Sequence, residues 1–338
     1  MYQIALITGD GIGPEISESM IKVLETINDK LGLKLKIEKL EAGDNALKRS
    51  GKALPESTLE AVKKSNACLK APVGESAADV IIVLRRMLNL YANIRPAKSY
   101  PNMPALKDNI DLVIVRENTE DLYTGMEFDL GNTAVALRTI SEDASKRIAK
   151  YAFLMAAHRN QKKKVTCVHK SNVMRKTDGL FARSCSDIAK NFHNIQFEQM
   201  YVDACAMNLI RQPEAFDVIV TTNLFGDILS DEAAQVVGGL GMAPAANIGD
   251  DFALFEPVHG AAFDIAGKNI ANPSSFILSA KMMFEWLGTK NNDKSCHDAA
   301  RKIEDAVYGI VKEGIKTKDI GGDKSTREFT QNVISRII

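Results

Sequence analysis

Two properties of nucleic-acid-binding and membrane proteins are missing from this sequence. Its 338 residues include 43 Lys plus Arg and 43 Asp plus Glu, so the formal net charge is zero. Binding to nucleic-acid phosphates needs surplus positive charge, so the composition argues against a nucleic-acid partner but allows a local basic site. The chain also has no apolar run of the ~18 residues that a membrane-spanning helix requires. Its start, MYQIALITGDGIG, lacks the basic segment and cleavage site of a secretory signal.

Cysteine is also scarce. The chain contains five, an odd number with no CxxC pair, at Cys68, Cys167, Cys185, Cys205 and Cys296. Scattered, unpaired cysteines do not indicate a disulfide framework. We therefore expect reduced, buried thiols and a cytoplasmic location.

What the sequence does contain is an alternation of short apolar runs and helical patterns. Apolar residues make up 45% and charged residues 25%, as in ordinary globular proteins. The length favours two domains over one, because a domain averages ~150 residues. A repeated strand-then-helix order predicts an α/β fold with a largely parallel sheet. The expected strands are 2–8, 33–38, 67–70, 111–116, 134–140, 165–169 and 216–221, and the expected helices begin at Pro14, at Leu59, at Ser76 (ending at Tyr91) and at Ser141.

The glycine-rich segment Gly9-Asp10-Gly11-Ile12-Gly13 lies between the first expected strand and helix. It is similar to the dinucleotide-binding fingerprint G-x-G-x-x-G, but its third glycine comes one position early. A tight turn from strand to helix needs glycines in any case. Taken alone, the segment favours a structural turn over a cofactor site.

Three arginines stand at positions that suit anion binding. Arg85 lies late in the helix expected after Ser76, Arg95 on the extended segment that follows, and Arg116 at the end of the strand DLVIVR. Strand ends in α/β sheets open into ligand crevices, and guanidinium groups hold carboxylates through paired hydrogen bonds. Three such groups could clamp a dicarboxylate; the alternative is three unrelated surface cations.

Three aspartates are candidate metal ligands. Asp227 and Asp231 are spaced i, i+4 in GDILSDEAAQ, so both lie on one helix face and repel each other unless a cation sits between them. Carboxylate oxygens favour Mg²⁺ or Mn²⁺. Asp203 in YVDACAMN is a candidate third ligand. The alternative is a solvated acidic face.

Candidate proton-transfer and cofactor groups follow the same strands. Tyr123 comes soon after Arg116, and Lys170 ends the strand before SNV. A lysine that is desolvated or close to other cations can act as a base. His259 precedes a loop of small residues that ends at Asp264, where a carboxylate could bind ribose hydroxyls. Each could also be an ordinary surface residue.

In chain order, these motifs resemble the β-decarboxylating dehydrogenases, which act on isocitrate, homoisocitrate or 3-isopropylmalate. The resemblance runs from GDGIGPE to GGD at Gly321 and includes LRRMLNLYANIRP, VRENTEDLY, HKSNVM, NLFGDILSDEAA, NIGD and EPVHGAAFDIAGKNIANP. It implies a doubly wound α/β fold that is not a Rossmann fold, with a cleft between two domains. Residues 1–97 and 238–338 would form the large domain with the NAD site, and 98–237 the small domain with the dimer interface and metal ligands.

The resemblance also implies catalytic roles. Tyr123 would protonate the enolate, and Lys170 of the partner subunit would assist deprotonation of the 2-hydroxyl. Asp227 and Asp231 would hold Mg²⁺ or Mn²⁺ together with Asp203 of the partner subunit. The active site would therefore be shared between the two subunits of a homodimer. The residues implied to contact the substrate are Arg85, Arg95, Arg116, Ile81, Ile82 and Asn172.

The same resemblance predicts NAD as the cofactor. NADP-dependent members have a Lys-Tyr pair where this chain has Asp264-Ile265. An aspartate can accept hydrogen bonds from the ribose hydroxyls of NAD and would repel a 2′-phosphate. The expected cofactor contacts are Glu256, His259, Gly260, Ala261, Ala262, Asp264, Ile265 and Asn272.

The helix expected after Ser76 should decide the substrate. Isocitrate enzymes of the family resemble one another in a Ser and an Asn that precede the first arginine, where this chain has Asp79 and Ile81. Homoisocitrate enzymes tend to have an Arg where this chain has Ile82. An apolar wall suits an isopropyl group, and Asp79 would repel an extra carboxylate. One departure is Ala78, where many isopropylmalate enzymes have a Glu.

We therefore expect NAD-dependent oxidative decarboxylation of 3-isopropylmalate to 4-methyl-2-oxopentanoate, as in leucine biosynthesis. The alternative within the family is an isocitrate or homoisocitrate dehydrogenase. A catalytically silent binding subunit is a third reading, but such a chain should have lost a site residue, and this one keeps them all.

Overall fold

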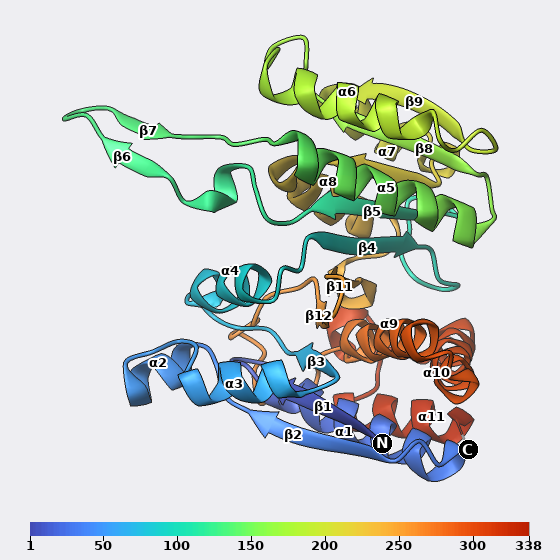
Figure 1. Cartoon of the computed structure of the whole chain (residues 1–338). Coiled ribbons are helices and arrows are strands. Elements are labelled where there is room, and N and C mark those ends of the chain that lie inside the picture. Colours follow the sequence, from blue (N-terminus) through green and yellow to red (C-terminus); the bar gives the residue numbers. More distant parts are fainter. Residues whose placement is uncertain (338) are drawn as a thin grey trace.

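The computed structural model describes residues 1–337, which form a mixed α/β protein built around one large sheet (Figure 1). The sheet has ten strands in the order β2-β1-β3-β12-β11-β4-β5-β10-β8-β9. These are β1 (Tyr2–Ile7), β2 (Leu35–Leu40), β3 (Ala67–Lys70), β4 (Ala92–Lys98), β5 (Asp111–Glu117), β8 (Lys164–His169), β9 (Gln196–Tyr201), β10 (Val218–Thr221), β11 (Pro244–Ile248) and β12 (Ala253–Pro257). Two short strands, β6 (Glu127–Asp129) and β7 (Ala134–Ala136), form an arm that projects from the rest of the molecule (Figure 1).

The sheet is parallel at both ends and antiparallel in the middle. Strands β2, β1, β3 and β12 are parallel neighbours, and so are β5, β10, β8 and β9. Between these groups, β11 is antiparallel to β12 and to β4, and β4 is antiparallel to β5. The α/β prediction is confirmed. The division into two domains stays a prediction, because one continuous sheet passes through both predicted regions.

Helices cover the two faces of the sheet. The long helices are α1 (Gly13–Leu31), α5 (Glu142–Arg159), α6 (Thr177–Ala189), α8 (Asn223–Val236), α9 (Ser274–Asn291), α10 (Lys294–Lys312) and α11 (Thr326–Ile337). The shorter ones are α2 (Asp44–Ser50), α3 (Glu56–Lys64), α4 (Ala77–Met87) and α7 (Val202–Arg211). In Figure 1, α2–α4 lie to the left of the sheet, and α9 and α10 lie to its right. No helix within residues 1–337 is long and apolar enough to cross a membrane.

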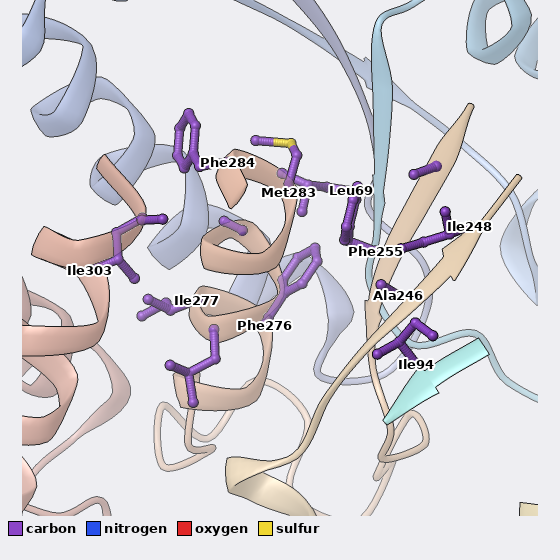
Figure 2. Close-up of a cluster of buried hydrophobic side chains, with 14 of the residues drawn as sticks. Leu69, Ile94, Ala246, Ile248, Phe255, Phe276, Ile277, Met283, Phe284 and Ile303 are labelled. Carbon is purple, nitrogen blue, oxygen red and sulfur yellow. The ribbon is translucent and has the colours of Figure 1, made fainter. Parts of the chain in front are cut away.

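One face of the sheet carries a continuous apolar core. Alternate residues of the strands, such as Leu69, Phe255 and Val115, pack there with α1, α5, α6 and α9–α11. Figure 2 shows part of this core, in which Phe276 of α9 lies beside the sheet residue Phe255, and Ile277 faces α10. The core spans both ends of the sheet and therefore holds the whole molecule together.

The opposite face has two separate apolar clusters. One lies under α3 and α4 and includes Cys68, Val80 and Leu254, and the other lies under α7 and α8 and includes Ile114 and Leu229. Between them, the strands alternate apolar residues toward the continuous core with polar residues toward this face, as the two-residue period of a strand requires. The polar stripe across the middle strands consists of Lys70, Glu256, Asn247, Asn93, Arg95 and Arg116.

Local signals in the sequence predicted some elements well. Pro14 lies in the first turn of α1, and the Ser141 hydroxyl accepts a hydrogen bond from the Ala144 N–H at the start of α5. The strand expected over 134–140 is only partly correct, because β7 ends at Ala136. The helix expected from Ser76 to Tyr91 ends at Met87, and its N-cap Ser76 donates its hydroxyl hydrogen to Asp44 instead of capping α4.

The glycine-rich turn is required by packing. Gly9 and Gly11 have φ of 64° and 57°. A Cβ on Gly9 would lie 1.9 Å from the Pro72 carbonyl oxygen, and one on Gly11 would lie 2.0 Å from that of Ala261. The Asp10 carboxylate accepts hydrogen bonds from the backbone N–H groups of residues 44, 45 and 74. These contacts support the structural interpretation of the segment. All five cysteines are free and buried, as expected.

Candidate active site

The three predicted arginines come together on the polar stripe. Arg95 and Arg116 belong to the antiparallel neighbours β4 and β5, and Arg85 reaches the stripe from the last turn of α4. Arg95 contacts Asp227 at 3.3 Å and Asp231 at 3.2 Å, and its Nη1 donates to the Ser230 hydroxyl at 2.8 Å. The interpretation as unrelated surface cations is therefore wrong.

Arg116 is buried with one donor group unused. Only 1% of its side chain is exposed. Its Nε donates to Asn223 at 2.9 Å, and its Nη1 donates to Asp227. Among residues 1–337, Nη2 finds no hydrogen-bond acceptor. Burial and the charges of Arg95 and Arg85 lower the pKa of Arg116 to about 9, so it stays cationic at neutral pH. A buried donor left unpaired costs free energy, and an anionic ligand would remove that cost.

Arg85 is held by a buried amide. Its Nε donates to Asn247 Oδ1 at 2.9 Å, and the same oxygen accepts from Asn93 Nδ2 at 2.7 Å and from Asn118 Nδ2 at 3.0 Å. Asn247 Nδ2 in turn donates to Glu256 at 2.8 Å. Asn93 Oδ1 accepts from Arg95 at 2.9 Å. This amide cluster fixes the directions of two of the arginines.

Glu256 joins the cluster from β12. It accepts from Lys70 at 2.8 Å and lies 3.5 Å from Arg85. Burial disfavours the charged carboxylate, but Lys70 and Arg85 outweigh it and lower the pKa of Glu256 to about 2. Glu256 was predicted as a cofactor contact, and the structure places it beside a predicted substrate arginine.

Tyr123 and Asp227 lie opposite Arg116. Tyr123 is part of the short 3₁₀ turn η1 (Leu122–Thr124), and its hydroxyl donates to Asp227. Its ring lies 5.0 Å below the Arg116 guanidinium, and its carbonyl accepts from Arg86 of α4 at 2.8 Å. Burial raises the pKa of Tyr123, as does the bond to Asp227, while Arg116 opposes the shift. Tyr123 therefore keeps its proton at neutral pH, as a proton donor must.

The pKa values of the two aspartates of α8 shift in opposite directions. Burial disfavours the charge of Asp227, yet Arg116 and Arg95 hold its pKa below the usual value. Burial raises the pKa of Asp231, helped by the negative charge of Asp227 and opposed by Arg95. The two carboxylates lie one helical turn apart and are partly exposed. Their oxygen atoms are ligands that suit a hard divalent cation.

Lys170 and Asp203 form a separate pair in the single chain. Lys170 follows β8, Asp203 opens α7 after β9, and their side chains are 2.8 Å apart. In the sheet, β9 lies two places from β10, so the strands that lead into α7 and α8 are about 10 Å apart. No group of three His, Cys, Asp or Glu side chains within residues 1–337 is arranged for a metal ion. Asp203 therefore does not join Asp227 and Asp231 within one chain.

Apart from Glu256, the predicted cofactor residues occupy the loop between β12 and α9. His259 and Ala262 are half-buried, Asp264 is exposed, and Ala262 has a φ of 42°. Burial lowers the pKa of His259, and its Nε2 is buried without a partner in the described chain. Asn272 is buried, and its side chain bonds within the protein, to Gly241 and Ser274. The loop therefore offers an unpaired imidazole nitrogen and a free carboxylate, whereas Asn272 is already bonded.

Helix α4, which is predicted to contact the substrate, carries two isoleucines close to Arg85 in the sequence. Ile81 and Ile82 lie four and three residues before it, about 40° and 60° away around the helix. Asp79 lies about 120° away. It faces a surface groove of about 600 Å³ that Leu47, Leu54 and Val83 also line. The expectation that Asp79 would repel a ligand beside Arg85 is therefore weakened, and the two isoleucines carry the apolar argument.

Several functional neighbours were not identified from the sequence. Asn247 and Lys70 are single polar residues in short apolar strands, Asn93 is one of three polar residues in β4, and Arg138 is one of many cations. The available signal is the alternation of apolar and polar residues in 92–95 and the lone Asn247 among the apolar residues of 244–248. It becomes specific only with the strand register, which pairs Asn93 with both Arg116 and Asn247.

Comparison with known proteins identifies the family. Residues 3–333 match the isocitrate/isopropylmalate dehydrogenase family model, so the chain belongs to that family and the resemblance is confirmed. A 3-isopropylmalate dehydrogenase of Sulfurisphaera tokodaii is 51% identical over 338 residues, 99% of each chain. A homoisocitrate dehydrogenase of Methanocaldococcus jannaschii is 45% identical over 354 aligned positions, covering 100% of this chain and 98% of the relative. The crystal structure of an isocitrate dehydrogenase from Methylococcus capsulatus superposes with a TM-score of 0.93 at 41% identity, covering 100% and 99% of the two chains.

Proposed function

We propose that this protein oxidatively decarboxylates 3-isopropylmalate to 4-methyl-2-oxopentanoate with NAD, in leucine biosynthesis. The observation that carries the proposal is the buried Arg116 with its unpaired Nη2, grouped with Arg85 and Arg95 beside an apolar stretch of α4. Three guanidinium groups match a dicarboxylate, and Ile81 and Ile82 suit an isopropyl group. The relative from Sulfurisphaera tokodaii, a 3-isopropylmalate dehydrogenase, supports this substrate over the alternatives.

The chain's own residues divide the work between binding and proton transfer. Arg85, Arg95 and Arg116 bind the two carboxylates and fix the orientation of C2 and C3. Lys170 of the partner subunit assists removal of the 2-hydroxyl proton. When carbon dioxide leaves, the electrons of its broken bond to C3 remain in the C2–C3 enolate. Tyr123 then donates the proton that C3 receives. The raised pKa of Tyr123 keeps that proton available.

The bound groups fit the residues present. Asp227 and Asp231, with Asp203 of the partner subunit, would hold Mg²⁺ or Mn²⁺, and the loop from His259 to Asp264 would hold the adenosine end of NAD. When bound, NAD supplies the acceptor for the C2 hydride and the divalent cation supplies positive charge beside the substrate oxygens. Asn172, exposed on the turn after Lys170, would face the same shared site from the partner subunit.

A second copy of the chain is the partner that this site needs. Met207 and Ile210 are 66% and 55% exposed on α7, at i+4 and i+7 from Asp203, and Ile228 on α8 is 58% exposed. Apolar residues grouped this way indicate a contact surface. Asp203, Met207 and Ile210 share one face of α7, and Ile228 lies on α8 between the two aspartates. A subunit docked on this surface would therefore bring its Asp203 toward the α8 aspartates. We infer a homodimer that works in the cytoplasm.

The test is NADH formation, followed by absorbance, with 3-isopropylmalate, isocitrate and homoisocitrate in parallel. We expect the largest kcat/KM for 3-isopropylmalate. A larger value for a tricarboxylate would overturn the substrate assignment but leave the family chemistry intact. An apolar pocket discriminates weakly, by ~10- to 200-fold per methylene, so some activity on smaller malates is expected.

Two matched variants test the apolar wall of α4 directly. Ile82→Arg places a cation beside Arg85 and should reduce kcat/KM for 3-isopropylmalate relative to the tricarboxylates. Val83→Arg places the same charge on the outer groove and should leave the preference unchanged. Equal effects of the two variants would show that the side of the helix facing Arg85 does not select the substrate. The cofactor assignment is tested by Asp264→Lys with Ile265→Tyr, which should shift preference from NAD toward NADP.

A further inference from the structure

Arg138 forms a buried junction that the proposed mechanism does not use. It follows the β6–β7 arm, and 11% of its side chain is exposed. Its Nε and Nη2 donate to the two oxygens of Asp121, at 2.5 and 3.2 Å, and its Nη1 donates to Asp178 at 2.6 Å. Both carboxylates are fully buried. One guanidinium group therefore links two buried carboxylates, and it stacks on the Phe225 ring with 4.9 Å to the ring centroid.

The Asp121 side of the junction holds the turn that carries Tyr123. Asp121 has a φ of 72°, a conformation uncommon for residues other than glycine. Its Oδ1 accepts from the Leu122 N–H at 3.0 Å, which caps the η1 turn. Its Oδ2 accepts from the Leu224 N–H at 3.0 Å, in the first turn of α8. Arg138 thereby fixes Asp121, which positions both Tyr123 and the helix of Asp227.

The Asp178 side holds the turn that carries Lys170. Asp178 belongs to the first turn of α6, and its Oδ2 accepts from the backbone N–H of Lys170 at 2.5 Å. A third contact, from Arg138 Nη2 to the Thr222 hydroxyl at 2.8 Å, reaches the N-cap of α8. The same guanidinium group therefore contacts the supports of Tyr123, of the α8 aspartates and of Lys170.

We propose that Arg138 is a positioning residue that aligns the groups one subunit gives to its own active site with the Lys170 that it gives to the partner's. This inference rests on the proposed shared site. It predicts that loss of Arg138 damages two sites at once, because the Tyr123 turn serves one site and the Lys170 turn serves the other. A residue that merely stabilised the fold would not damage the sites in this pattern.

The test uses heterodimers made by co-expressing two differently tagged full-length chains. A Tyr123→Phe chain paired with a Lys170→Met chain combines both defects in one site and leaves the other site intact, so the heterodimer should regain about half the wild-type activity per dimer. Arg138→Met should lower kcat by about 100-fold, the usual loss when a catalytic group moves by ~1 Å. A heterodimer of an Arg138→Met chain with a Tyr123→Phe chain should not regain activity, and neither should one with a Lys170→Met chain.

Matched controls separate positioning from folding. Arg159 in the same half of the sheet also links two carboxylates, Asp111 and Asp217, each at 2.9 Å, but touches none of the proposed site residues. Arg159→Gln should therefore lower the thermal midpoint and yet complement both single-site variants. If Arg138→Met fails to fold, the same pairings are made with Arg138→Lys, because the single ammonium group of lysine cannot span both carboxylates.

Each result decides between readings. If an Arg138 variant restores activity with one of the single-site variants, the coupling is refuted while the shared site stands. If Tyr123→Phe and Lys170→Met do not complement each other, the shared site itself is refuted, and the coupling with it. Failure of Arg138→Lys and Arg138→Met to complement, beside success of Arg159→Gln, supports the proposal.

Discussion

The amide of Asn247 should be the most sensitive point of the site, and Asn247→Leu tests this. The side chain is fully buried, and leucine has a similar size and shape. The substitution removes one oxygen that accepts from Arg85, Asn93 and Asn118, and one donor to Glu256. It therefore deletes four hydrogen bonds without opening a large cavity.

The free-energy loss follows from which groups keep a partner. Asn118 Nδ2 keeps the Leu90 carbonyl at 2.9 Å, and Glu256 keeps Lys70. Arg85 Nε and Asn93 Nδ2 are left buried and unpaired. Each unsatisfied group costs ~1–3 kcal/mol, with the charged one at the upper end, so we expect a total loss of about 4 kcal/mol. The freed Arg85 should also raise KM for the substrate by about tenfold, since its orientation depends on this amide.

The assay is equilibrium urea unfolding at fixed protein concentration, combined with steady-state kinetics. Thr166→Val is the control, because this buried hydroxyl makes one bond, to Glu198 at 2.8 Å, and lies outside the site. It should cost about 1 kcal/mol and leave KM unchanged. A loss below about 1 kcal/mol for Asn247→Leu, with an unchanged urea m value, would refute the reasoning that this amide holds the arginines.

Three further predictions address acid stability, anion binding and helix capping. The pKa of Glu256 is about 2 in the folded protein and 4.5 when unperturbed. The contribution of its charge to the free energy of unfolding is therefore complete above about pH 5 and is lost as the pH falls toward 2. The stability difference between wild type and Glu256→Gln should therefore change by about 3 kcal/mol over that window, measured by urea midpoints, and a constant difference would contradict the assignment. Arg116→Lys removes the bond to Asn223 and the unpaired donor, so KM for the substrate should rise by about 10- to 100-fold, and an unchanged KM would remove Arg116 from the carboxylate site. Ser141→Ala removes both the cap on the Ala144 N–H and the hydrogen bond from the Ser141 hydroxyl to Glu120, so it should cost at least about 1 kcal/mol in thermal unfolding, and no shift would show that neither bond contributes.

Sequence patterns predicted the parts of the site that lie at ends of strands and on helices. Arg116 ends an apolar run, and Asp227 and Asp231 are one turn apart, so the patterns made each a candidate ligand, whereas the family resemblance assigned them to one site. The structure adds that Tyr123 meets Asp227 directly. Patterns of this kind are local, which is why one sequence was enough to find them.

The amide cluster could not be predicted because its geometry depends on register. Asn93 and Asn247 are 154 residues apart and meet only because β4 and β11 pair antiparallel at that position. The orientation of Asp79 had the same difficulty. Its neighbours on α4 from Ala77 to Val83 are all apolar, so the sequence does not show which side of the helix packs against the sheet. In both cases the missing information was long-range.

The antiparallel middle of the sheet explains why the polar residues gather there. At the parallel ends, helices can cover both faces, and the inner strands β1 and β10 are apolar on both sides, whereas the edge strands β2 and β9 alternate apolar with polar residues. Where β11 and β4 run against their neighbours, only one face receives a continuous helical cover, and the other is left between two apolar clusters. Between these clusters each buried arginine is bonded in a set direction: Asn247 holds Arg85, and Asn223 holds Arg116. In the proposed site, the arginines assigned to the substrate are held from the sheet, whereas Tyr123 and Lys170 are held from turns joined by Arg138. Substitution of Asn247 should mainly affect KM and substitution of Arg138 mainly kcat, and the opposite assignment would show that sheet and turns do not divide the work in this way.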